Sequence, residues 1–122
     1  MSFNRFIILL FILDLIWIFG MKGMHQDVVS KVQLAPLQVD YMASGLFYIV
    51  APLAYVFFIS KLAKTNNQAF ALGLLMGFLM YSTFDLTNKA IFKDYPWSYA
   101  LADMTWGTFL IGLVSAITFK YF

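Results

Sequence analysis

Residues 3–21, FNRFIILLFILDLIWIFGM, decide the fold of this chain. Most of these residues are Leu, Ile or Phe, and a helix of roughly 20 such residues crosses the hydrocarbon core of a bilayer. Arg5 near the start of the stretch and Gly20 near its end resemble the flanks of a signal peptide. The apolar part is too long for one, however, and no small-x-small cleavage site follows it. We therefore expect a retained transmembrane helix.

The rest of the chain continues this apolar character. Of its 122 residues, 62% are hydrophobic and 11% are charged, whereas soluble domains carry about 25% charged residues. Three further spans are expected at about 41–60, 70–91 and 97–119. The sequence thus predicts a single membrane domain over residues 1–122, an all-α integral membrane four-helix bundle. An even number of spans places both termini on the same side.

The connection over residues 22–40 is expected to be partly helical. Met24, Val28, Val32 and Ala35 recur at helical spacing, and Pro36 should end the segment. It either extends the first helix or lies in the membrane interface. His25 is the only histidine, and outside the spans we expect it to be solvated or interfacial.

Charge and composition exclude several classes of protein. The basic residues are scattered, which argues against nucleic-acid binding. The chain has no cysteine, and neither a cofactor motif nor a metal site is recognisable. Lys and Arg are split evenly between the two sides, so the positive-inside rule does not fix the orientation. Asp27, Asp40 and Asp94 favour cytoplasmic termini weakly, and the balance also allows dual insertion as an antiparallel homo-oligomer.

Three aspartates fall inside the expected spans. Asp14 lies near the end of the first, Asp85 near the end of the third and Asp103 near the start of the fourth. At about 1.5 Å per residue, all three lie roughly 9 to 11 Å below the same membrane surface. We expect them to approach one another inside the bundle, because a carboxylate facing acyl chains is costly.

The third span places its polar residues on one face. Tyr81, Asp85, Asn88 and Lys89 follow one another at i, i+4, i+7 and i+8. An ion pair between Asp85 and Lys89 would offset part of the cost of burying both. Gly73 and Gly77 extend this face as a Gly-x-x-x-Gly pair, which we interpret as a helix-packing surface.

Asp14 and Asp103 have no such basic partner. We expect them either to hold protons or to be completed by a cation or the head group of a ligand. The candidate binding site consists of the aspartates and their polar and aromatic neighbours: Asp14, Asp85, Asp103, Asn88, Lys89, Tyr48, Tyr81, Trp17 and Trp106.

Four blocks of residues carry a family resemblance: DLIW at 14–17, LFY at 46–48, YSTFDLTN at 81–88 and DMTWGT at 103–108. With these blocks the chain resembles the family of predicted membrane proteins called domain of unknown function 2177, over nearly its whole length. The resemblance implies a small four-helix membrane protein and carries no activity with it.

Three functions remain open. The first is a small-solute or cation binding or transport protein, coupled to protons, since carboxylates inside a bilayer mark such pathways. The second is an enzyme that modifies lipids, with one carboxylate as base and another as acid. This is disfavoured because no histidine or cysteine lies in the spans. The third is a structural or assembly subunit without a ligand, whose aspartates hold helices together by hydrogen bonds.

Overall fold

A computed structural model describes residues 2–121, in which helices joined by short non-helical segments are formed and no strand is present. The all-α prediction is confirmed. In chain order the elements are α1 (Ser2–Gly20), α2 (Lys22–Gln33), α3 (Tyr41–Ala54), the π-helical segment η1 (Tyr55–Ile59), α4 (Ser60–Leu62), α5 (Asn66–Ile91) and α6 (Trp97–Lys120).

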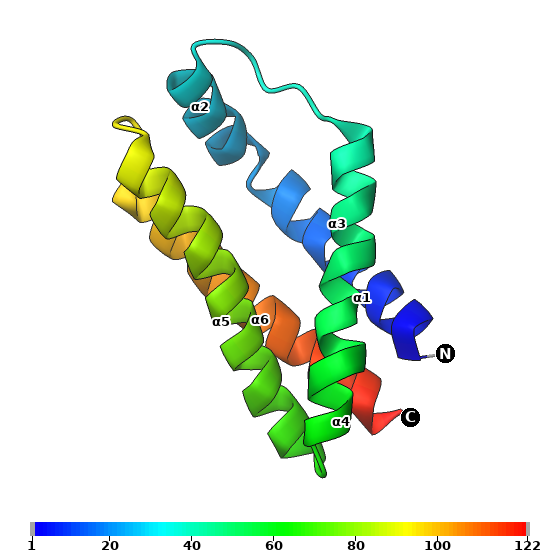
Figure 1. Cartoon of the computed structure of the whole chain (residues 1–122). Helices are drawn as coiled ribbons and strands as arrows, with labels where there is room; N and C mark the ends of the chain where they lie inside the picture. Colours follow the sequence, from blue (N-terminus) through cyan, green and yellow to red (C-terminus); the bar gives the residue numbers. More distant parts are fainter. Residues whose placement is uncertain (1, 122) are drawn as a thin grey trace.

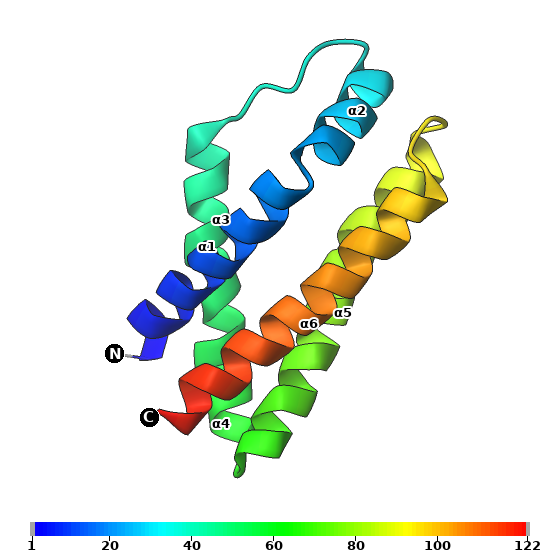
Figure 2. The same cartoon turned by 180° about the vertical axis from the view of Figure 1, so that it is seen from behind.

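Four helices within the described residues are long and apolar enough to cross a membrane: Phe3–Gly20, Tyr41–Leu62, Asn66–Ile91 and Trp97–Lys120. They run alternately up and down, and both ends of the chain lie at the end of the bundle that carries the turn before α5 (Figures 1 and 2). α2 and the turn between α5 and α6 lie at the opposite end. The three intramembrane aspartates lie nearer to this end of the bundle than to the end with the termini.

Side-chain caps define where two of these helices begin. Asp40 accepts a hydrogen bond from the backbone N–H of Ala43 at 3.0 Å at the start of α3. Thr65 accepts one from the N–H of Gln68 at 3.2 Å at the start of α5. Each side chain satisfies an N–H that the first helical turn leaves without a partner. The cap at Thr65 starts α5 earlier than hydropathy alone predicts for this span.

α2 is a separate helix, because the helical conformation is interrupted by a turn at Met21. It ends at Leu34, whose φ of 58° is left-handed, so the helix stops before Pro36 is reached. The Gln33 side chain donates to the carbonyl oxygens of Ala35 and Pro36, at 3.1 and 2.7 Å. These bonds satisfy two carbonyl groups in the extended segment that leads to α3.

The second span contains a proline and a π-helical turn. Pro52 lies inside α3, where it has no N–H to donate and where its ring crowds the preceding turn. The hydrogen-bond pattern then changes to the wider π spacing over Tyr55–Ile59. Tyr55 and Ile59 on this segment are buried, so the π segment packs into the bundle together with Ala51 and Pro52 of α3.

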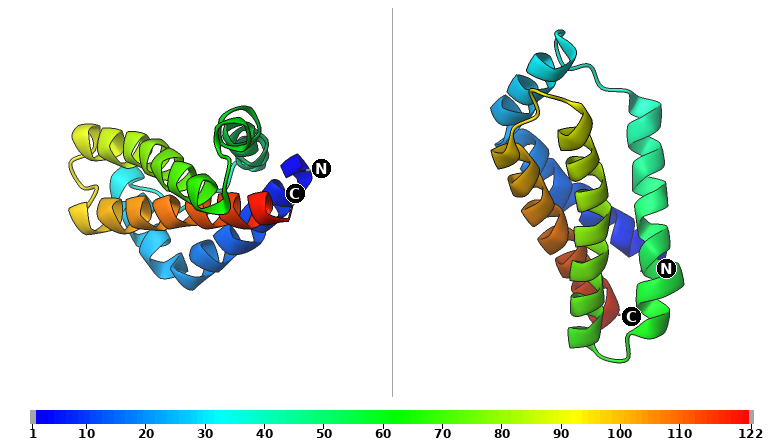
Figure 3. Two further views of the ribbon diagram at one scale, coloured as in Figure 1. Left: turned by 90° about the horizontal axis from the view of Figure 1, so that it is seen from below. Right: turned by 60° about the vertical axis from the view of Figure 1, so that its left-hand side comes forward.

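α5 and α6 form a tightly packed antiparallel pair, seen side by side in Figures 1 and 3. A Cβ at Gly73 would lie 2.7 Å from Ser115 Oγ and 2.8 Å from the Cα of Gly112, and a Cβ at Gly77 would collide with the carbonyl oxygen of Gly107. Only glycine allows the two backbones to approach so closely. The predicted packing role of Gly73 and Gly77 is confirmed.

The apolar core divides into two clusters along the bundle. The larger lies toward the chain termini and includes Phe6, Leu10, Tyr55, Leu110 and Val114. The smaller joins α2 to the opposite end of α5 and α6, through contacts among Val28, Tyr95 and Ala100. The intramembrane aspartates lie between the two clusters. Many large apolar side chains on the outside of the bundle are exposed, as a surface facing lipid requires.

The close contact between α5 and α6 gives a direct test of the packing. We expect Gly77→Leu to lower the free energy of unfolding by about 1 to 3 kcal/mol, because the new side chain forces the helices apart. Gly45→Leu is the matched control, since no atom lies within 4 Å of a Cβ at that position. Thermal unfolding in detergent measures both. Equal melting temperatures for the two variants would contradict the packing described here.

Candidate functional site

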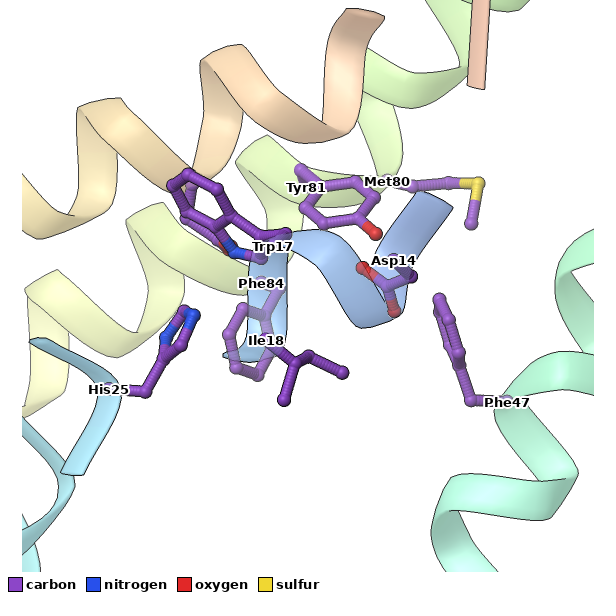
Figure 4. Close-up of a pocket in the computed structure, with 9 residues that line it drawn as sticks. Asp14, Trp17, Ile18, His25, Phe47, Met80, Tyr81 and Phe84 are labelled. Carbon is purple, nitrogen blue, oxygen red and sulfur yellow. The ribbon is translucent and has the colours of Figure 1, made fainter. Parts of the chain in front are cut away.

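A partly open cavity of about 450 Å³ lies between the two apolar clusters. It is bounded by residues from α1, α2, α3, α5 and α6, so no single helix forms it (Figure 4). Its lining residues are Asp14, Trp17, Ile18, His25, Phe47, Met80, Tyr81, Phe84 and Asp103. The cavity thus combines aromatic walls with two carboxylates.

Asp14 is held at the meeting point of three helices. Tyr48 on α3 donates a hydrogen bond to its Oδ2 at 2.7 Å, and the Trp106 indole on α6 donates to its Oδ1 at 3.4 Å. The side chain is 8% exposed. Because each oxygen accepts from a different helix, this carboxylate ties α1 to both α3 and α6.

Asp85 and Asp103 face each other across the α5–α6 interface. Asp85 is fully buried, and its Oδ1 accepts a 2.6 Å hydrogen bond from Tyr95, whereas its Oδ2 has no hydrogen-bond partner. Asp103, which is 8% exposed, interacts with Asp85, with the Trp17 indole and with the charge of Asp14. Two carboxylates this close repel each other, and a shared proton or a cation between them relieves the repulsion.

Stacked aromatic rings form one wall of the cavity. Trp17 of α1 lies on Trp106 of α6 with ring centroids 5.2 Å apart and planes 8° from parallel. The indole N–H of Trp17 is buried without a hydrogen-bond partner. On α5, the ring of Tyr81 lies directly over Gly107, where any Cβ would collide with it. Gly107 therefore determines where the Tyr81 ring stands.

His25 is a lining residue that sequence reasoning missed. The expectation of a solvated side chain is wrong, because α2 turns this partly buried ring into the cavity, edge-on to Trp17 with centroids 5.5 Å apart. Its Nδ1 is 2.7 Å from Tyr99 Oη, and its Nε2 is buried without a partner. The signal was present: His25, Val28 and Val32 share one helical face, and Val28 is the buried residue of α2.

The other predicted site residues lie around the cavity rather than in it. Asp85, Tyr48 and Trp106 stand behind its wall, where they contact Asp103 or Asp14. Asn88 lines a second cavity of about 290 Å³ beneath α2, together with Tyr95 and Tyr99.

The expected ion pair between Asp85 and Lys89 is wrong. Within residues 2–121, the salt bridge formed is the exposed pair of Lys31 and Asp27, at 3.3 Å. The Lys89 ammonium lies over the ring of Trp97, 5.7 Å from its centroid. A flexible lysine reaches the hydrated end of the helix more cheaply than it enters the dry interface. Asp85 accepts from Tyr95 instead.

Metal binding finds no support in this arrangement. Within the described part of the chain, no three His, Cys, Asp or Glu side chains are grouped so that they could hold a metal ion. The polar groups of the cavity are spread over its wall.

The histidine offers a test of the cavity's polarity. Burial lowers the pKa of His25, while the Trp17 carbonyl and the negative charge of Asp14 act in the opposite direction. We expect its imidazole signal in NMR to titrate below the ordinary value of about 6.5. Asp14→Asn should lower the midpoint further, because it removes a charge that favours imidazolium.

The sign for stability follows from the same shift. With a lowered pKa in the folded state, the unfolded chain binds more protons, so the fold should lose stability as pH falls through about 6.5. His25→Gln should remove this component of the acid slope in thermal unfolding. A midpoint at or above 6.5, or an unchanged slope in the variant, would contradict the burial of the ring described here.

Comparison with known proteins agrees with this architecture. The family model described as "Predicted membrane protein (DUF2177)" matches residues 1–120. Neither the curated proteins nor the solved structures provide a match. The four apolar helices fit the integral membrane location that the family description states. The chain therefore belongs to the DUF2177 family of predicted membrane proteins.

Proposed function

We propose that this membrane protein binds a small organic cation in the cavity between its helices and exchanges it for protons, as a small transporter does. The observation that carries the proposal is Asp103. This carboxylate is nine-tenths buried, lines a 450 Å³ cavity and lies against Asp85, whose Oδ2 is buried without a hydrogen-bond partner. A buried carboxylate without a donor is stabilised by a proton or by a cationic ligand.

The walls of the cavity support a cationic ligand. None of its lining residues is Lys or Arg. The faces of Trp17, Tyr81 and Phe84 attract a positive charge through their ring quadrupoles, most strongly where water is absent. The volume lies within the range of about 300 to 1,000 Å³ that is usual for sites of small organic ligands.

Proton exchange follows from the carboxyl pair. Asp85 and Asp103 share one low-dielectric space, and Asp14 lies within electrostatic reach of Asp103. Without a ligand such a group retains at least one proton, and an arriving cation displaces it. With the termini in the cytoplasm, as the Asp residues of the opposite connections favour, the cavity lies in the outer half of the bilayer.

A second candidate function is supported by His25. A buried imidazole nitrogen without a partner, in a cavity that also holds two carboxylates, provides the base that an enzyme acting on a lipid needs. The structural alternative is supported by Asp14, whose two oxygens already bind two other helices. Neither alternative accounts for the unpartnered Oδ2 of Asp85 beside Asp103.

Binding of phenethylamine, a compact aromatic monocation, tests the proposal. We expect it to change the fluorescence of the Trp17 and Trp106 stack. Asp103→Asn should weaken its affinity about tenfold, which is about 1.4 kcal/mol. Asp94→Asn removes the same charge from an exposed turn and serves as the control. Equal affinities in the two variants, or no binding to the parent protein, would refute a cation site at Asp103.

The pH dependence of the same measurement tests the exchange. Because a proton and the cation compete for the carboxylates, the affinity should rise with pH and protons should be released on binding. Asp103→Asn should flatten this dependence, whereas His25→Gln should preserve it. A structural role alone predicts that Asp103→Asn lowers folded yield and that the parent shows neither binding nor proton release.

A further inference from the structure

Packed side chains flank the cavity at both ends along the axis of the bundle. Toward the chain termini it meets the larger apolar cluster, which contains Leu10, Tyr55 and Leu110. Toward the other membrane surface it is covered by α2, where Val28 packs against Tyr95 and His25 contacts Tyr99. A ligand that reaches the carboxylates from water would have to displace one of these packed layers.

Between α3 and α5, the side of the cavity is less tightly packed than its two ends. The second span packs on α5 mainly through its π segment, Tyr55–Ile59. Nearer the cavity, α3 diverges from α5, as Figures 1 and 3 show. Phe47 of α3 and Phe84 of α5 lie on opposite sides of this opening, with Ile18 of α1 beside Phe84 (Figure 4). Phe84 is 57% exposed and Ile18 is 39% exposed, so the rim is apolar and accessible.

The depth of the opening places it among acyl chains. Asp103 lies six residues into α6, which begins at Trp97, and this is about 9 Å along the helix. A rim of Phe and Ile side chains at this level contacts hydrocarbon rather than water. Molecules that reach the rim must therefore already be dissolved in the membrane.

We propose that the ligand is a membrane-dissolved amphiphile with a single amine head group, which reaches the cavity sideways between α3 and α5. This inference rests on the proposed cation site and names its class of ligand. The head group lies against Asp103 and the aromatic wall, and the alkyl chain passes between Phe47 and Phe84 into the bilayer. Anionic head groups are disfavoured, because the lining carries two carboxylates and neither Lys nor Arg.

The proton balance of this step is simple. A neutral amine moves within the hydrocarbon at lower cost than its charged form. An alkylammonium ion leaves its own proton in the water when it enters the hydrocarbon as the neutral amine, so one proton is released overall. At the site the amine takes the proton that the carboxyl group holds and becomes an ammonium ion paired with the carboxylate. One proton moves from oxygen to nitrogen, and no other bond forms or breaks. The pair is stabilised because both charges lie in a space of low dielectric constant.

Photolabelling in nanodiscs of phosphatidylcholine tests the route. The probe is dodecylamine with a diazirine near the end of its chain, and the labelled residues are identified by mass spectrometry. We expect labelling of α3 and α5 around Phe47 and Phe84, with about tenfold less in Asp103→Asn. Unlabelled dodecylamine should compete, whereas butylamine at equal concentration should not.

A second pair of variants guards against loss of fold at Asp103. Ile18→Trp narrows the rim without touching a carboxylate and should lower labelling several-fold. Ile16→Trp places the same side chain on α1 at an exposed residue outside the lining, and should leave labelling unchanged. Equal labelling in these two variants would overturn the sideways route.

The remaining outcomes separate the two proposals. If butylamine and phenethylamine bind through Asp103 as tightly as dodecylamine does, the cation site stands and the amphiphile is overturned. If no amine binds, both proposals fail. Labelling spread over the whole lipid-facing surface, or protein–protein adducts showing that a second copy covers the rim, would also overturn the proposal.

Discussion

The bundle is organised by the cost of placing a carboxylate in hydrocarbon, about 2.5 to 3.5 kcal/mol at the centre of a helix. Asp14, Asp85 and Asp103 are each at least nine-tenths buried, and each is covered by side chains from other helices. Tyr48 and Trp106 bind Asp14, and Tyr95 binds Asp85. The positions of α1, α3 and the turn after α5 follow from these contacts, because none of these helices could shield its carboxylate alone.

Glycine contacts make this shielding compatible with a cavity. Gly73 and Gly77 bring α5 against α6 so closely that Asp85 and Asp103 share one buried space. Gly107 leaves room for the Tyr81 ring, which then forms part of the cavity wall. The α5–α6 pair acts as a rigid half of the molecule. At the level of the carboxylates α1 stays in contact with α6 through Trp17 and Trp106, whereas α3 diverges from α5 (Figure 1), which leaves the cavity open to the side.

The errors of sequence reasoning have physical causes. Helical spacing predicts an ion pair between Lys89 and Asp85. The long side chain of Lys89 instead places its ammonium over Trp97 at the end of the helix. The place of His25 after the first span predicts a position at the surface. Hydropathy does not reveal that the chain turns at Met21. Once α2 docks through Val28, the imidazole on the same face enters the cavity. A helical-wheel reading of Val28 and Val32 would have identified it.

Hydropathy and spacing determined what is local: the helical fold, the number of crossings, the common side of the termini, the depth of the three aspartates and the glycine face of α5. These properties depend on one helix and the bilayer at a time. Tertiary structure alone decided which oxygen each tyrosine and tryptophan binds, that His25 lines the cavity, and where the cavity opens. The rotation of a helix and the angle between two helices depend on contacts between distant residues, and periodicity within one helix carries no information about them.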